Sequence, residues 1–243
     1  MAVQGNSRLT QVEEGSERII ISPSIYAADF YNLEHEISRI PSADWIHVDI
    51  MDGLFVPNFS MGYPQIRALK QHTDKLLDVH LMIEKPIRYI KDFSDAGADV
   101  ITVHVESDSE ENIRNALTAI HNEGKTGGLA VSPDTPAEAV LPYLSLADLI
   151  LVMTIYPGIP NQRLLPRMLE KIRKVRSYLD IKAPACLLEA DGGISPYTIG
   201  EVVKAGASVI VSGGAIFGNA DADSAVREMR KIGEKGHELC NRG

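Results

Sequence analysis

The chain has 243 residues, of which 44% are hydrophobic and 23% are charged, close to the average for soluble globular proteins. This composition excludes wholesale disorder, and the length suits one large α/β barrel or two small domains. Lys and Arg number 24 against 33 Asp and Glu, giving a formal net charge of −9. Because an acidic chain without a basic run binds polyanions poorly, we expect no nucleic-acid partner. Backbone N–H groups can still bind a small anion.

The ends of the chain and its two cysteines point to the cytoplasm. Cys186 and Cys240 form no disulfide framework and no metal motif, as is typical of a reducing compartment. The longest apolar run, 149–155, is too short to span a bilayer. Residues 1–18 are polar and lack a signal-peptide pattern, so we expect an N-terminal extension there and a single folded domain over 19–243.

Short β-branched runs alternate with amphipathic stretches along the chain. This alternation indicates βαβ units and a parallel sheet. The expected strands are 19–22, 45–49, 76–81, 100–105, 125–131, 149–153, 186–190 and 208–212. The clearest of about eight expected helices are 32–40, 110–123, 164–179 and 197–205. Gly97 and Gly206, each between two alanines, suit helix C-caps just before a strand.

Eight βα units favour a single (β/α)8 TIM barrel over an open doubly wound sheet. An open dinucleotide-binding sheet needs a glycine-rich turn after its first strand, whereas residues 22–30 read SPSIYAADF, without a glycine. No Pro/Gly/Ser-rich linker divides the chain. In such a barrel, polar residues at the C-terminal ends of the strands become the catalytic candidates.

Three strand ends carry histidine and aspartate. Strand side chains alternate between faces, so His47 and Asp49 share a face, and His80 has the same parity at the end of the third strand. Asp191 closes the seventh strand before two glycines. A lone strand-end histidine is more often structural, and an Asp before Gly-Gly is often a turn former. Together, however, two His and two Asp at one barrel mouth suit a zinc, manganese or iron site.

The other histidines receive no direct role. His104 ends the fourth strand beside Glu106, and we expect it to be structural or to support the site. The remaining four lie in polar helical or loop stretches and are expected to face solvent: His35, His72, His121 and His237.

Two pairs of glycines, Gly192-Gly193 and Gly213-Gly214, follow the seventh and eighth expected strands. A tight turn alone would explain either pair. Both pairs at these two positions let backbone N–H groups approach an anion beside a short helix, which is where such barrels bind phosphate. The sequence therefore predicts a phosphate site.

These residues lie in motifs that resemble the ribulose-phosphate 3-epimerase family. The motifs follow in order from about residue 20 to the last helix, and the H-x-D-x-M-D-G-x-F-V-P-N run is highly specific. They are SPS at 22–24, HVDIMDGLFVPNFSMG at 47–62, DVHLM at 78–82, VMT at 152–154 with PG at 157–158, DGGI at 191–194 and VSGGAI at 211–216. Allulose-6-phosphate 3-epimerases share the same motifs.

The resemblance implies an isomerase that uses one divalent metal ion to invert carbon 3 of a ketose phosphate. By position it places the metal on His47, Asp49, His80 and Asp191, and makes Asp49 and Asp191 the acid/base pair. The ion would be zinc, iron, manganese or cobalt, with zinc favoured. The implied substrate-binding residues are Ser24, His80, Met51, Met82, Met153, Gly158, Gly192, Gly193, Gly213 and Gly214. A homo-oligomer, dimer or hexamer, is also implied.

One loop departs from the family. After Pro157-Gly158 the family usually continues Phe-Gly-Gly-Gln, whereas this chain reads IPNQ at 159–162. Proline has no N–H to donate, so half of the expected phosphate cradle is altered. Asn161 is a candidate substrate-binding residue that supplies a replacement donor. A substrate of different length, or a different closure of the loop, stays open.

Three alternatives follow. Decarboxylases and hexulose-phosphate synthases on the same barrel carry an Asp-x-Lys-x-x-Asp strand end, whereas residues 49–52 read DIMD without a lysine. A metabolite-binding barrel without turnover is a second alternative, opposed by the presence of all four metal-site residues. Among epimerases, D-ribulose 5-phosphate, giving D-xylulose 5-phosphate, is favoured over allulose 6-phosphate because it is the commonest substrate of the family.

Overall fold

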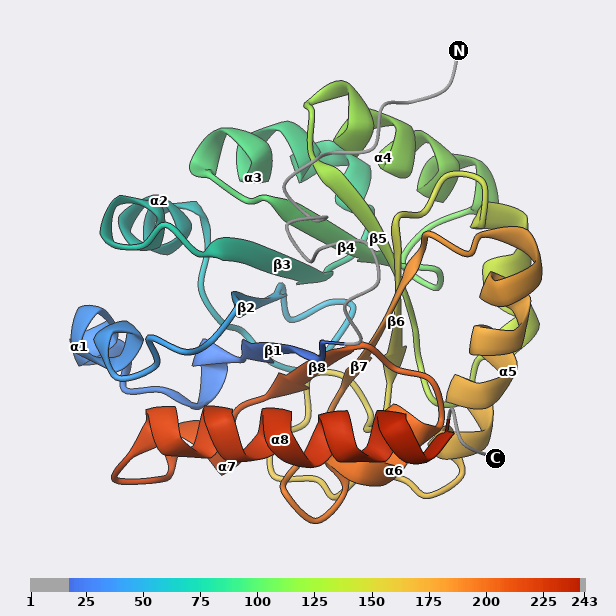
Figure 1. The fold of residues 1–243 in the computed structure, drawn as a ribbon. Coiled ribbons are helices and arrows are strands. Elements are labelled where there is room, and N and C mark those ends of the chain that lie inside the picture. The colour runs from blue at the N-terminus through green and yellow to red at the C-terminus, as the bar shows by residue number, and fades with distance from the viewer. Residues whose placement is uncertain (1–17, 241–243) are drawn as a thin grey trace.

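The computed structural model describes residues 18–240 and contains one eight-stranded parallel sheet in the order β1-β8-β7-β6-β5-β4-β3-β2. Figure 1 shows the strands at the centre with the helices around them. The strands are β1 Ile20–Pro23, β2 Trp45–Met51, β3 Leu76–Met82, β4 Val100–His104, β5 Thr126–Val131, β6 Leu149–Met153, β7 Leu187–Asp191 and β8 Val209–Ser212. This is the predicted barrel, and each strand lies within two residues of its predicted bounds.

Helices follow the strands and cover the outside of the sheet (Figure 1). They are α1 Leu33–Ser38, α2 Tyr63–His72, α3 Ile90–Ala96, α4 Glu110–Asn122, α5 Met168–Lys182, α6 Ile199–Lys204, α7 Gly214–Phe217 and α8 Ala222–Cys240. Within residues 18–240, no helix is long and apolar enough to cross a membrane. Residues 1–17 of the expected extension lie outside the described residues.

Prolines account for two features of the helical segments. The expected helix at 164–179 begins later, at Met168, because Pro166 disfavours helical backbone at the residue before it. Between β5 and β6 the chain forms a 3₁₀ segment, Ala137–Tyr143, with Pro142 inside it. A proline inside an α-helix removes one hydrogen bond and clashes with the preceding turn, which favours the shorter element. The predicted glycine C-cap at Gly97 is present, with a φ of 113°.

The alternation of strand side chains separates two apolar clusters. On β2, Ile46, Val48 and Ile50 belong to the large cluster between the strands and the helices. Trp45 belongs instead to a smaller cluster drawn mainly from the strands. His47 and Asp49 lie on the same face of β2 as Trp45, because side chains alternate along a strand, so both point into the lumen of the barrel.

The barrel is nearly closed, and its seam lies between β1 and β2. A single parallel bridge joins Ser24 to His47. Further down the seam the Asp44 carboxylate accepts the Ile21 N–H at 2.8 Å. Arg230 of α8 donates to the same carboxylate at 2.7 Å. A side chain therefore replaces part of the missing strand ladder.

We predict that Asp44→Ala lowers the free energy of unfolding by about 2–4 kcal/mol, because it orphans the N–H of Ile21 and removes the partner of Arg230. Chemical denaturation of the two proteins measures the difference. Asp95→Ala is the matched control, since Asp95 pairs with Lys91 on the surface, and it is expected to change stability by less than about 0.5 kcal/mol. Equal losses in both variants would contradict this account of the seam.

Candidate active site

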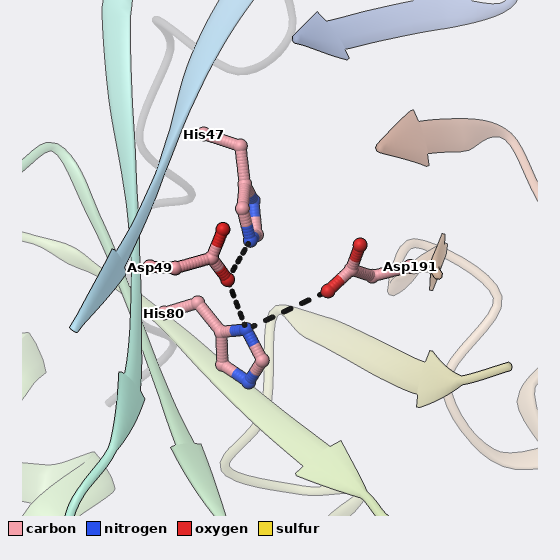
Figure 2. Close-up of side chains that lie close together, drawn as sticks. All are labelled: His47, Asp49, His80 and Asp191. Carbon is pink, nitrogen blue, oxygen red and sulfur yellow. Dashed lines mark ion pairs between the residues drawn. The ribbon is translucent and has the colours of Figure 1, made fainter. Parts of the chain in front are cut away.

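Strands β2, β3 and β7 bring four polar side chains together at the C-terminal end of the barrel: His47, Asp49, His80 and Asp191 (Figure 2). One donor atom of each lies within 4.8 Å of the others. Asp49 Oδ1 is 3.4 Å from both His47 Nε2 and His80 Nδ1. Asp191 Oδ2 approaches His80 Nδ1 from the other side at 3.8 Å. These are the four residues that the sequence proposed for a metal.

The histidine nitrogens that face this cluster lack hydrogen-bond partners. Both His47 Nε2 and His80 Nδ1 are buried and unpaired. A buried polar atom without a hydrogen-bond partner is unfavourable, so two such nitrogens aimed at one point fit a site that binds a cation. Two imidazole nitrogens and two carboxylates form a donor set that fits zinc and several other divalent ions.

His47 is oriented by a buried carboxylate. Its Nδ1 donates to Asp78 Oδ2 at 2.6 Å, and Ser22 Oγ also donates to that oxygen, at 3.3 Å. When the ring is neutral, the proton on Nδ1 leaves a lone pair on Nε2, which is the atom that faces the cluster. Burial alone would lower the pKa of His47, but the facing Asp78 and Asp49 outweigh it and raise that pKa well above its usual value.

The two carboxyl groups of the cluster lie in opposed electrostatic environments. Burial alone would raise the pKa of Asp49, but contacts with His47 and His80 hold that pKa well below its usual range. Ser24 Oγ also donates to Asp49, at 2.6 Å. Burial, reinforced by the charge of Asp49, raises the pKa of Asp191 to about 7. One carboxyl is therefore ionised while the other readily holds a proton.

A cavity of about 680 Å³ opens above this cluster. His80, also proposed to bind substrate, is fully buried beneath it. The other predicted substrate-binding residues line the cavity: Ser24, Met51, Met82, Met153, Gly158, Asn161, Gly192, Gly193, Gly213 and Gly214. Tyr26, Gln162 and Ser195 line it as well and were not predicted.

The loop after β6 is organised by one side chain. The Gln162 amide donates to Tyr156 O at 2.7 Å and to Ile159 O at 2.8 Å. Asn161 beside it has a φ of 58°, in the left-handed region that asparagine tolerates better than most residues. The replacement of a family glycine by Asn161 is therefore compatible with a glycine-like backbone at that position.

Two buried carboxyls near the site were missed. Asp78 and Glu189, both fully buried, lie below the cluster and received no role, although their parity with His80 and Asp191 places them on the lumen face. His104, expected to be structural or supporting, contacts His80 directly.

Of the four histidines expected to face solvent, His121 and His237 are only partly exposed. The His121 side chain is only 21% exposed, and its Nε2 lies 2.8 Å from Asp148 Oδ2, because α4 packs it toward β5. His35 and His72 are exposed, and His237 is partly exposed.

Comparison with known proteins agrees with this geometry. The sequence profile described as the ribulose-phosphate 3 epimerase family matches residues 20–217. A Synechocystis protein named ribulose-phosphate 3-epimerase is 41% identical over 217 residues, which cover 88% of this chain and 94% of that protein. The rice protein named ribulose-phosphate 3-epimerase, cytoplasmic isoform, is 40% identical over 216 residues, covering 87% of this chain and 92% of that one.

Solved structures share the fold at lower identity. The crystal structure of 3-hexulose-6-phosphate synthase from Salmonella typhimurium superposes with a TM-score of 0.70 at 19% identity, covering 90% of this chain and all of that one. Such a likeness concerns the barrel alone, because one barrel supports many chemistries.

We predict that Gly193→Ala lowers the free energy of unfolding by about 2–4 kcal/mol. Gly193 has a φ of +64°, and an added Cβ would lie 2.4 Å from the backbone nitrogen of Leu164. Gly214→Ala is the control, because a Cβ there meets nothing within 4 Å, and we expect it to change stability by less than about 1 kcal/mol. Denaturant titration distinguishes the two, and a harmless Gly193→Ala would refute the packing argument.

Proposed function

The chain belongs to the ribulose-phosphate 3 epimerase family, and from that premise we propose that it interconverts D-ribulose 5-phosphate and D-xylulose 5-phosphate with the help of one divalent metal ion. The observation that carries this proposal is the pair Asp49 and Asp191, which enter one cavity from different strands with opposed tendencies to hold a proton. The reaction is an isomerisation that inverts carbon 3.

Inversion needs two proton-transferring groups. A single base that returns its own proton to the same face restores the original configuration. Two carboxyls on opposite sides of the sugar can remove a proton from one face and deliver another to the opposite face, and their roles exchange with the direction of reaction. Asp49 on β2 and Asp191 on β7 come from strands that are not neighbours: across the seam, β1 and β8 lie between them. This supports their placement on different sides of the substrate.

The resting protonation states suit the first step. Asp49, ionised and hydrogen-bonded by Ser24 Oγ, is ready to accept the proton from carbon 3. Burial raises the pKa of Asp191 to about 7 before a cation binds. A cation held by both carboxylates would lower that pKa and keep Asp191 ionised until it exchanges a proton. Loss of the proton next to the ketone gives an enediolate, and reprotonation on the far face gives the epimer.

The metal site would be formed by His47, Asp49, His80 and Asp191. A bound divalent cation supplies positive charge that stabilises the negative charge developing on the substrate oxygens. We favour zinc, since two imidazoles and two carboxylates suit its usual four-coordinate geometry. Iron, manganese and cobalt are the other ions that such a donor set accepts.

The rest of the cavity would hold the sugar and its phosphate. Met51, Met82 and Met153 are nearly buried and offer an apolar, polarizable wall beside the reacting carbons. The glycines after β7 and β8 line the other end of the cavity and expose backbone N–H groups to an anion. The substrate-binding set would be completed by Ser24, His80, Gly158, Asn161, Gly192, Gly193, Gly213 and Gly214.

We also propose the setting in which the protein works. Residues 19–243 would form one catalytic domain, with residues 1–18 as a polar extension. The similarity to the rice protein named as a cytoplasmic isoform supports a cytoplasmic location. Its partners would be the phosphorylated ketose and further copies of the chain, in a dimer or hexamer, and no nucleic acid.

The loop after β6 supports a second candidate substrate. Pro160 offers no N–H, and Asn161 adds an exposed amide beside the cavity. A longer sugar phosphate such as allulose 6-phosphate would place its phosphate differently against this loop. A binding barrel without turnover is the alternative of another class, and it predicts metal binding with no proton exchange.

We predict that Asp49→Asn and Asp191→Asn each lower the epimerisation rate by about 10²–10⁴-fold, because an amide cannot accept or deliver the proton. Metal content and thermal unfolding of each variant are measured beside the rate, so that loss of metal is separated from loss of the proton-transferring group. Near wild-type turnover in either metal-loaded variant would show that two carboxyls are not required.

We further predict that the zinc-loaded protein introduces deuterium at carbon 3 of ribulose 5-phosphate in deuterium oxide, with xylulose 5-phosphate accumulating. Carbon-resolved NMR of ribulose 5-phosphate and allulose 6-phosphate, in separate samples, gives the relative rates. Faster exchange on the hexulose would transfer the proposal to that substrate. Metal binding without exchange on either sugar would favour the binding barrel.

A further inference from the structure

A chain of hydrogen-bonding groups leads away from the cluster through His80. His80 Nε2 lies 2.9 Å from His104 Nε2. His104 Nδ1 lies 3.0 Å from Glu106 Oε2, and Glu106 Oε1 accepts the Ser132 N–H at 2.8 Å. Both imidazoles are fully buried and stack with their ring centres 5.0 Å apart. The series connects the bottom of the cavity to the loop after β5.

The positions of the protons in this chain follow from simple bookkeeping. Glu106 accepts at both oxygens, so His104 carries its proton on Nδ1. His104 Nε2 is then a lone pair, and His80 must donate its Nε2–H to it. With its proton on Nε2, a neutral His80 presents the lone pair of Nδ1 to Asp49 and Asp191.

The charge of Glu106 agrees with these proton positions. Burial alone would raise the pKa of Glu106, but its bonds with His104 and Ser132 N–H lower it to about 2, so the group is a carboxylate. Ser132 Oγ, at 3.3 Å from His104 Nδ1, is a more distant and uncharged partner.

We propose that His104 and Glu106 are positioning residues for the metal site. Their hydrogen bonds hold His80 as the tautomer that offers Nδ1, and they place the Glu106 carboxylate at the far end of the hydrogen-bonded series. The inference rests on the proposed metal site, not on the identity of the sugar. His47 is held directly by Asp78, which binds its Nδ1. In His47 it is therefore Nε2, and not Nδ1, that faces the cluster. Each histidine thus depends on a carboxylate that is not itself a ligand.

Glu106→Gln is the first test variant. An amide has one acceptor oxygen, so it cannot serve both His104 Nδ1–H and Ser132 N–H. If its NH₂ group faces His104 instead, the proton order of the whole chain reverses and His80 loses its lone pair on Nδ1. In either case we expect zinc to bind about 10–100-fold more weakly. Competition with a chromophoric chelator measures that affinity in the full-length protein.

Asp148→Asn is the matched control. Asp148 also joins a histidine ring to a backbone N–H, accepting from Gly127 N at 2.8 Å and contacting His121 Nε2 at 2.8 Å. It has no contact with the four cluster residues among those that the structure describes. We expect its zinc affinity to stay within about twofold of the wild type even if its stability falls.

Two further readouts separate positioning from general support of the fold. Nitrogen-15 NMR of the zinc-loaded wild type is expected to show the proton of His104 on Nδ1 and that of His80 on Nε2. His104→Phe keeps the ring that packs on Phe55 but removes the acceptor, and we expect the same loss of zinc affinity together with a changed cobalt absorption spectrum.

The outcomes are distinct. A His104 proton on Nε2, or zinc affinity within twofold of wild type in both Glu106→Gln and His104→Phe, overturns the inference. An equal loss in Asp148→Asn also overturns it, since the effect would then be one of stability. Because the readout is zinc binding, a wild-type protein that binds zinc but does not epimerise contradicts only the proposed reaction. A wild-type protein that binds none of zinc, iron, manganese and cobalt contradicts both.

Discussion

Side-chain alternation in a nearly closed parallel barrel is the constraint on which this structure depends. Every second residue of a strand enters a lumen with little water, where a charge must meet a partner. β2 places His47 and Asp49 there, and β3 and β7 supply the facing groups. Each buried imidazole is accordingly matched to a carboxylate, directly through Asp78 or through His104. The same geometry leaves two histidine nitrogens without hydrogen-bond partners and aimed at one point.

Much of this arrangement could be predicted from the sequence, because it depends on the alternation of side chains along strands and on the residues that end each strand. The eight strands and the proximity of His47, Asp49, His80 and Asp191 follow from runs of apolar residues that end in polar ones. Exact side-chain contacts between neighbouring strands were harder to predict. The 2.9 Å contact between His80 and His104 depends on the relative register of β3 and β4, which no local pattern encodes. The left-handed backbone of Asn161 likewise depends on the loop packed around it.

Family and fold answer different questions here. The barrel is shared with a hexulose-phosphate synthase at 19% identity, so the fold alone leaves the reaction open. The side chains at the strand ends narrow the choice of reaction: they include two histidines and two aspartates, and no lysine lies between Asp49 and Asp52. The two carboxyls of that site, Asp49 and Asp191, are the groups that we propose to transfer the protons.

The seam at Asp44 has a consequence for how the site is assembled during synthesis. Arg230, which completes the ion pair on Asp44, is 186 positions further along the chain, on the last helix. Contacts of such sequence separation form late, because a long loop must close first. The bridge between Ser24 and His47 lies on the same seam. We therefore expect a nascent chain that still lacks α8 to hold the residues of the proposed site apart, so that the proposed metal site is completed only when translation is nearly finished.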